Sequence, residues 1–293
     1  MQIVVLALFL GAILTLLSDS LKQALRGALA RRPALVFATP GLLTTVFCLA
    51  AATAGAASLP LALAMLAYTF APTLCAWAAG PGPVKGRPGW LDFAAIALLW
   101  LPLEFAAGAS LVPKAAQGYL HSVAYGVAIL LALVLFAGFR ALPGMKYNLP
   151  RRARDYAIPA AGFLLLAPVL YLLAVPLGFV NQPHLPPHPH PGPMAARYAL
   201  IFVATALPEE ILFRSLVQNL LMLRFGFTNA VLALSAAVFG LAHLNNGSLL
   251  NWRYAILAAV AGFGFGKVFE MAGSVLSSAG VHATVNAVKH FFL

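Results

Sequence analysis

Long apolar runs separated by short polar connections make up most of the chain. Windows of roughly 20 apolar residues, the length that crosses a bilayer as a helix, can be placed about ten times. They fall at residues 2–18, 34–54, 57–79, 91–112, 119–139, 157–180, 198–223, 229–244, 252–269 and 273–292. The pattern predicts an all-α polytopic membrane protein, a bundle of about eight to ten transmembrane helices.

The overall composition agrees with a chain that lies in a bilayer. Hydrophobic residues make up 62% of the sequence and charged residues 9%, and the mean hydropathy is +0.92. No Lys or Arg precedes the first window and Asp19 follows it, which favours a retained first helix over a cleaved signal peptide. The alanine-rich, short-looped style is compatible with a prokaryotic inner membrane.

The net charge of +11 is explained by the loops rather than by a nucleic-acid surface. Basic residues gather in alternate connections and form no stripe with interleaved aromatic residues, so nucleic acid is not an expected partner. The positive-inside rule predicts that these connections are cytoplasmic and that the N-terminus lies outside. They hold Lys22, Arg26, Arg31 and Arg32, then Lys85 and Arg87, then Arg140, Lys146, Arg151, Arg152 and Arg154; the other connections hold little more than Lys114, Arg197 and Arg253.

A proline-rich segment at 181–194 divides the chain. It separates an N-terminal transmembrane block, 1–180, from a C-terminal block, 195–293. Prolines alternate there with His184, His188 and His190, which predicts an extended connector, with a histidine metal site as the alternative. The two cysteines, Cys48 and Cys75, lie inside apolar windows without metal-type spacing, so we interpret them as packing residues.

The candidate chemistry lies in the C-terminal block. Glu209 and Glu210 stand in the middle of an apolar window although the chain has only seven acidic residues. Carboxylates inside a membrane are costly and usually mark function. The same block contains Arg214, His243, His282 and Asn286. Spacings of four residues place Glu210 with Arg214, Phe239 with His243 and His282 with Asn286 on shared helix faces, so three helices can direct polar groups to one place.

Pro208 immediately precedes the glutamate pair. It removes one backbone hydrogen bond and clashes with the carbonyl of Ala204, which predicts a kink that admits water. Arg214 can compensate Glu210, while the other carboxylate becomes a candidate general base, although spacing alone does not assign the two roles. Two alternatives are buried ion pairs that only tie helices together and a proton or cation pathway in a polytopic transporter.

These residues form three motifs that resemble one family. The motifs are E-E-x-x-x-R from Glu209 to Arg214, F-x-x-x-H from Phe239 to His243, and H-x-x-x-N from His282 to Asn286. In this order on successive apolar segments they resemble the CAAX protease and bacteriocin-processing family, the type II CAAX prenyl endopeptidase-like glutamic intramembrane proteases. The resemblance covers about the last third of the chain.

The resemblance implies an intramembrane endopeptidase without a cofactor. It would hydrolyse a peptide bond near a membrane-embedded or membrane-anchored end of a protein or peptide. Glu209, with Glu210 beside it, would work with His243 to activate a water molecule, and His282 with Asn286 would stabilise the oxyanion. Donors placed in advance around a developing oxyanion suit that chemistry. The expected partners are such a substrate and the lipid bilayer.

A zinc-dependent, metalloendopeptidase-like mechanism is the alternative, because two histidines and a carboxylate can hold zinc. The zinc motif H-E-x-x-H is absent, since Leu244 follows His243 and Ala283 follows His282. Two further features outside the motifs are expected to be structural. Glu104 is expected to pair within the bundle, and Gly262 with Gly266 has the small-residue spacing that lets membrane helices approach closely.

Overall fold

The computed structural model describes residues 2–82, 87–104, 117–180, 183–184, 190–244 and 250–293. The predicted loop residues Lys85 and Lys114, and half of the 181–194 connector including His188, lie outside the described residues. In the part that is described, the regular secondary structure is helical, which confirms the all-α fold class. The chain forms two compact units, Met1–Gly144 and Met145–Leu293. The boundary expected at the 181–194 connector stays a prediction.

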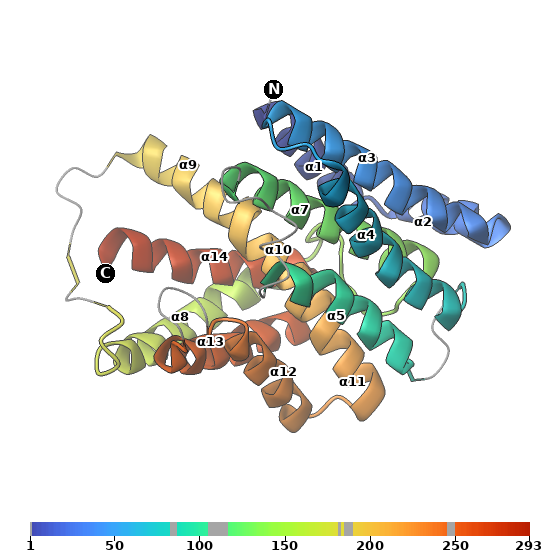
Figure 1. Ribbon diagram of the computed structural model, residues 1–293. Helices are drawn as coiled ribbons and strands as arrows, with labels where there is room; N and C mark the ends of the chain where they lie inside the picture. Colours follow the sequence, from blue (N-terminus) through green and yellow to red (C-terminus); the bar gives the residue numbers. More distant parts are fainter. Residues whose placement is uncertain (1, 83–86, 105–116, 181–182, 185–189, 245–249) are drawn as a thin grey trace. The chain divides into compact units, whose positions relative to one another are not determined.

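The first unit contains the helices from α1 to η3 (Figure 1). They are α1 (Gln2–Thr15), α2 (Asp19–Arg31), η1 (Pro33–Phe37), α3 (Ala38–Thr53), α4 (Leu59–Ala79), α5 (Trp90–Glu104), α7 (Gln117–Ala132) and η3 (Leu133–Phe139). The core includes fully buried Phe47 and Met65. Glu104 accepts hydrogen bonds from Trp100 Nε1 at 3.4 Å and Tyr125 Oη at 3.3 Å, in line with the structural role expected for it.

The second unit carries every candidate site residue. Its helices are α8 (Arg154–Ala174), α9 (Pro191–Ile201), η4 (Phe202–Ala206), α10 (Leu207–Glu210), η5 (Ile211–Gln218), α11 (Asn219–Phe225), α12 (Asn229–Leu241), α13 (Trp252–Met271) and α14 (Val275–Phe292). Helix α14 packs against α8, α10 and α13, and α12 packs against α13. Side-chain oxygens of Thr228, Asn251 and Ser274 cap the first turns of α12, α13 and α14, as expected for these residue types.

Five of the described helical segments are long and apolar enough to cross a membrane. They are Pro33–Thr53, Leu59–Ala79, Gly118–Phe139, Arg154–Ala174 and Trp252–Met271. Helices α1 and α2, bent by 87° at their junction, would make a sixth if they form one broken span. The sequence windows are more numerous because an apolar run need not be one long helix: α12 has only 13 residues, and Glu209, Glu210 and Arg214 interrupt the 198–223 window. The protein is an integral membrane protein.

Glycine brings α12 and α13 into close contact. A Cβ on Gly240 would meet the backbone carbonyl of Ala255 and lie 2.8 Å from Ala259 Cβ. A Cβ on Gly262 would lie 2.8 Å from the Phe239 ring, and one on Gly266 would lie 2.6 Å from Gln218 Oε1. The packing role predicted for Gly262 and Gly266 is confirmed, and the close approach holds the helix with the F-x-x-x-H motif against its neighbour.

Hydrogen bonds from the loop before α8 and from the first turn of α8 hold the turn between α13 and α14 in place. Lys146 Nζ donates to the carbonyls of Phe269, Glu270 and Ala272 at 2.7, 2.9 and 3.0 Å. Burial lowers the pKa of the Lys146 side chain, and the charge of nearby Glu270 opposes that shift. Asp155 accepts a hydrogen bond from Gly273 N at 2.7 Å. These bonds satisfy the last carbonyls of α13 and set where α14 begins.

Candidate active site

One continuous run of helix, from Pro191 to Phe225, carries the glutamate pair. The four-residue helix α10 contains Pro208, Glu209 and Glu210, and π-helical turns lie on both sides of it, at Phe202–Ala206 and Ile211–Gln218. The distortion expected from Pro208 therefore takes the form of wide turns in which backbone bonds reach five residues back, as from Leu207 N to Phe202 O. Such turns recur at functional sites because they change the direction in which side chains project.

Glu210 is buried, and both of its oxygens are engaged. Its Oε2 atom lies 3.1 Å from Arg214 Nε and also accepts a hydrogen bond from Ser278 Oγ. Its Oε1 atom lies 3.0 Å from His282 Nδ1. The side chains of Glu210 and Arg214 are both 0% exposed, and the Arg214 guanidinium lies 4.9 Å from the centre of the Phe239 ring. The ion pair expected from the spacing of four is thus present within one helix. The contacts of Glu210 with Ser278 and His282 join that helix to α14.

Glu209 is in a different position from its neighbour. Its side chain is 29% exposed, and its Oε2 atom lies 3.9 Å from His243 Nε2 and 3.9 Å from His282 Nε2. Two imidazole rings, one from the turn after α12 and one from α14, therefore converge on one carboxylate oxygen of α10. A separation of 3.9 Å is too long for a direct hydrogen bond and is suited to a bridging water molecule.

The second ring nitrogen of each histidine fixes how that ring faces Glu209. His243 Nδ1 lies 2.8 Å from the carbonyl oxygen of Phe239, and His282 Nδ1 lies 3.0 Å from Glu210 Oε1. Because a carbonyl and a carboxylate only accept hydrogen bonds, each Nδ1 carries the proton and each Nε2 faces Glu209. In their neutral forms both histidines therefore present a lone pair to the site.

Aromatic rings hold the two histidines in place. The Phe239 ring lies 4.7 Å from the His243 ring and 5.9 Å, edge-on, from the His282 ring. The Phe265 ring stacks on His282 with centroids 4.6 Å apart and planes 17° from parallel. The first residue of the F-x-x-x-H motif thus contacts both histidines, while Phe265, on α13, is a contact that the motifs did not indicate.

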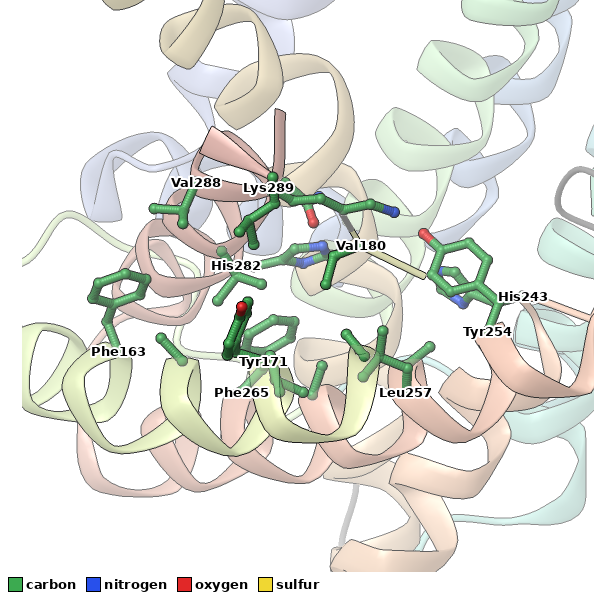
Figure 2. Close-up of a pocket in the computed structure, with 18 of the residues that line it drawn as sticks. Phe163, Tyr171, Val180, His243, Tyr254, Leu257, Phe265, His282, Val288 and Lys289 are labelled. Atoms are coloured by element: carbon green, nitrogen blue, oxygen red, sulfur yellow. The ribbon is translucent and has the colours of Figure 1, made fainter. Parts of the chain in front are cut away.

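An apolar cavity of about 100 Å³ opens beside the histidines (Figure 2). His243, His282 and Asn286 line it together with mainly apolar side chains, among them Phe163, Leu170, Val180, Leu257, Phe265 and Val288. Asn286 lies one turn beyond His282 on α14, as the spacing predicted. The cavity has an apolar body and a few polar groups at its wall, which is the usual composition of a ligand site.

Besides Phe265, three site residues were missed by sequence reasoning. Ser278 binds Glu210, while Tyr254 and Lys289 line the cavity. Two of them had a signal in the sequence, since Ser278 lies four residues before His282 and Lys289 lies seven residues after it on the same face of α14. Tyr254 had none, because its place beside His243 depends on the packing of α13 against α12.

The described residues give the zinc alternative no geometric support. In this part of the chain, no group of three or more His, Cys, Asp or Glu side chains has an arrangement that could hold a metal ion. The Pro/His connector is described only in part, and within that part His184 donates a backbone hydrogen bond to the carbonyl of Phe292 at 3.0 Å.

Comparison with known proteins identifies the region that holds the site. Residues 191–288 match the family described as type II CAAX prenyl endopeptidase Rce1-like. The match begins at the first residue of α9 and includes all three motifs, so the resemblance predicted from them is confirmed for about a third of the chain. No curated protein and no solved structure gives a significant match.

Proposed function

Because residues 191–288 form an Rce1-like domain, we propose that this membrane protein is a glutamate-dependent intramembrane endopeptidase. It would cleave a peptide bond near the membrane-embedded or membrane-anchored end of a protein or peptide. The observation that carries the proposal is the convergence of His243 Nε2 and His282 Nε2 on Glu209 Oε2, each at 3.9 Å. A water molecule bound there would touch a carboxylate and an imidazole at once.

In the proposed mechanism Glu209 is the general base. Its exposed fraction of 29% leaves it reachable by water, whereas Glu210 is fully buried and already occupied. Glu209 takes a proton from the water molecule while His243 orients that water, and the resulting hydroxide attacks the peptide carbonyl carbon. Glu209 then returns the proton to the departing amine. The geometry thus supports Glu209 as the chemical residue and Glu210 as the positioning residue.

His282 and Asn286 are the proposed oxyanion donors. His282 Nδ1 is already bonded to Glu210, so only Nε2 remains to face the substrate. His282 can therefore donate a hydrogen bond to the oxyanion only in its doubly protonated form. Asn286 donates through its side-chain amide and needs no such change. The pair would stabilise negative charge that appears only after attack.

The decisive experiment is a cleavage assay with the Glu209→Gln variant. The full-length protein is reconstituted in proteoliposomes with a library of lipid-anchored, fluorogenic peptides. We expect turnover to fall by about 10²–10⁴-fold, as for the loss of a general base. Glu270→Gln is the matched control, because Glu270 forms a part-exposed pair with Lys267 at 2.8 Å and is not a site residue. Near-normal turnover by Glu209→Gln would refute the mechanism, and ion flux without proteolysis would favour the transporter alternative.

The same assay separates the glutamate mechanism from the zinc mechanism. We expect activity to survive stringent chelation, and Asn286→Ala to lose about 10²–10³-fold in turnover with unchanged metal content. One tightly bound zinc per chain in the active protein, lost in His243→Ala together with activity, would replace the mechanism and leave the peptidase assignment in place.

A further inference from the structure

Helix α14 presents a third polar residue to the cavity, beyond the two in its motif. His282, Asn286 and Lys289 follow one another at helical spacing and all line the cavity. Among the side chains that line it, Lys289 is the only one with a full charge at neutral pH. Lys289 is exposed, so a ligand can reach it. The cavity is therefore apolar along its body and cationic at one end.

The ammonium group of Lys289 is held by aromatic rings. Its Nζ atom lies 4.2 Å from the centre of the Phe179 ring and 5.4 Å from the centre of the Tyr254 ring. Within the described residues it forms no ion pair with an acidic side chain. Cation–π contacts orient the ammonium group but leave its hydrogen-bond donors unused. An anionic group that entered the cavity would find those donors already in position.

The cationic end is close to the candidate catalytic residues. Figure 2 shows Lys289 extending from α14 toward Tyr254, which lies beside His243. The Tyr254 and His243 ring centres are 4.9 Å apart. Together with the 5.4 Å from Lys289 Nζ to Tyr254, this places the ammonium within about 10 Å of the His243 ring, a distance that about three extended residues span.

We propose that Lys289 is a specificity residue that binds a carboxylate of the peptide substrate. The inference rests on the proposed function, because the ligand is taken to be a peptide held across the site. Apolar side chains of that peptide would fill the body of the cavity while its carboxylate pairs with Lys289. The α-carboxylate of a free C-terminus and the side chain of Asp or Glu supply the same chemistry, and the test distinguishes them.

The test measures binding rather than cleavage. Short apolar peptides carrying a fluorophore are prepared in matched pairs, as free acids and as C-terminal amides. Equilibrium binding to full-length protein in detergent micelles is followed by fluorescence anisotropy, in the Glu209→Gln background so that no peptide is consumed. We expect the free acid to bind about tenfold more tightly than the amide, as for one charge-assisted hydrogen bond.

Three variants locate the effect. Lys289→Met should reduce the acid-to-amide preference to about one, and Lys289→Arg should restore it because the charge is kept. Lys267→Met removes a lysine of the neighbouring helix that does not line the cavity, and should retain the wild-type preference. Equal binding of acid and amide to the parent, or a preference that survives Lys289→Met, would overturn the proposal.

A third peptide identifies the source of the carboxylate. It is an amide with Glu as its last residue, so that its only carboxylate is on a side chain. Tight binding that depends on Lys289 would assign recognition to an acidic side chain, and weak binding would assign it to a free C-terminus. A Lys289-dependent preference in a protein that cleaves no peptide would support the carboxylate site while refuting the peptidase, so the two proposals can fail separately.

Discussion

At the scale of single residues, the two adjacent glutamates differ in their exposure and in their bonding partners. Glu210 is 0% exposed and bound by Arg214, Ser278 and His282, whereas Glu209 is 29% exposed and faces two imidazole rings. A carboxylate that is fully engaged in a buried network has little capacity to move a proton. Adjacent residues on a helix point about 100° apart, so one side chain can hold the bundle together while the next faces the two histidines.

The buried ion pair makes Arg214 a stability prediction. Arg214→Ala would leave the carboxylate of Glu210 buried without its arginine partner and with only the contacts of Ser278 and His282, at a cost of about 3–5 kcal/mol. We expect a large drop in the thermal midpoint in detergent together with a loss of activity. Arg197→Ala is the control, since Arg197 is an exposed residue of the same continuous helix and should change stability by no more than about 0.5 kcal/mol.

One outcome would contradict the stability prediction for Arg214. A variant Arg214→Ala as thermostable as the parent would mean that the pair with Glu210 contributes nothing to folding. The positioning role proposed for Glu210 would then have to rest on Ser278 and His282 alone.

At the scale of elements, the site depends on how closely helices can approach and on how their ends are fastened. The π turns around α10 aim Glu209 and Glu210, the glycine contacts between α12 and α13 place His243, and the Lys146 loop places α14. Each of these features positions the backbone at a point several residues away from the candidate catalytic side chains. The arrangement of the three polar helices therefore depends on residues that have no chemical role.

Gly240 provides the element-scale prediction. In Gly240→Ala the new Cβ would meet the carbonyl of Ala255 and the Cβ of Ala259, so α12 and α13 must separate or the protein must unfold. Overpacking of this kind typically costs about 1–3 kcal/mol. In Gly280→Ala, on α14, nothing lies within 4 Å of the new Cβ, and higher helix propensity should leave stability equal or raise it by about 0.5–1 kcal/mol.

Denaturant titration of both glycine variants in the same detergent measures the contrast. We also expect Gly240→Ala to lower peptidase turnover, because His243 lies three residues farther along and would move with α12. Equal stability of the two variants would show that the helices tolerate separation there.

At the scale of the whole molecule, the charge of the loops predicts its orientation. Arg151, Arg152 and Arg154 follow η3, at a position expected on the cytoplasmic side, whereas Arg253, in the first turn of α13, is expected outside. With Cys48 and Cys75 replaced by alanine, single cysteines at Arg152 and at Arg253 can be tested in intact cells with a membrane-impermeant maleimide. We expect Arg253→Cys to react directly and Arg152→Cys to react only after permeabilisation.

The opposite labelling pattern would show that the protein is inserted in the opposite orientation and that the site opens toward the other compartment. The measurement also bears on the side from which a substrate enters. That side is set by the orientation of α14, which carries His282, and of α12, which ends two residues before His243.

The sequence by itself determined those properties that depend on neighbouring positions. Apolar runs require helices in a bilayer, and a spacing of four placed Glu210 beside Arg214 and Asn286 one turn from His282 on any helix. The three ordered motifs were sufficient to indicate the family. The number of membrane-spanning helices could not be predicted as well, because hydropathy does not reveal where an apolar run changes to π turns or where a helix ends after 13 residues.

Only the tertiary structure decided which residues meet across helices. The contacts in question are the equal distances from Glu209 to His243 and His282, the hydrogen bond from Ser278 to Glu210, the stacking of Phe265 on His282 and the closeness of Tyr254 to Lys289. They join positions that are 17 to 73 residues apart. Such contacts depend on helix rotation and depth, which side-chain packing and glycine contacts set. The assignment of two identical neighbours to different roles therefore follows from packing and not from their order in the chain.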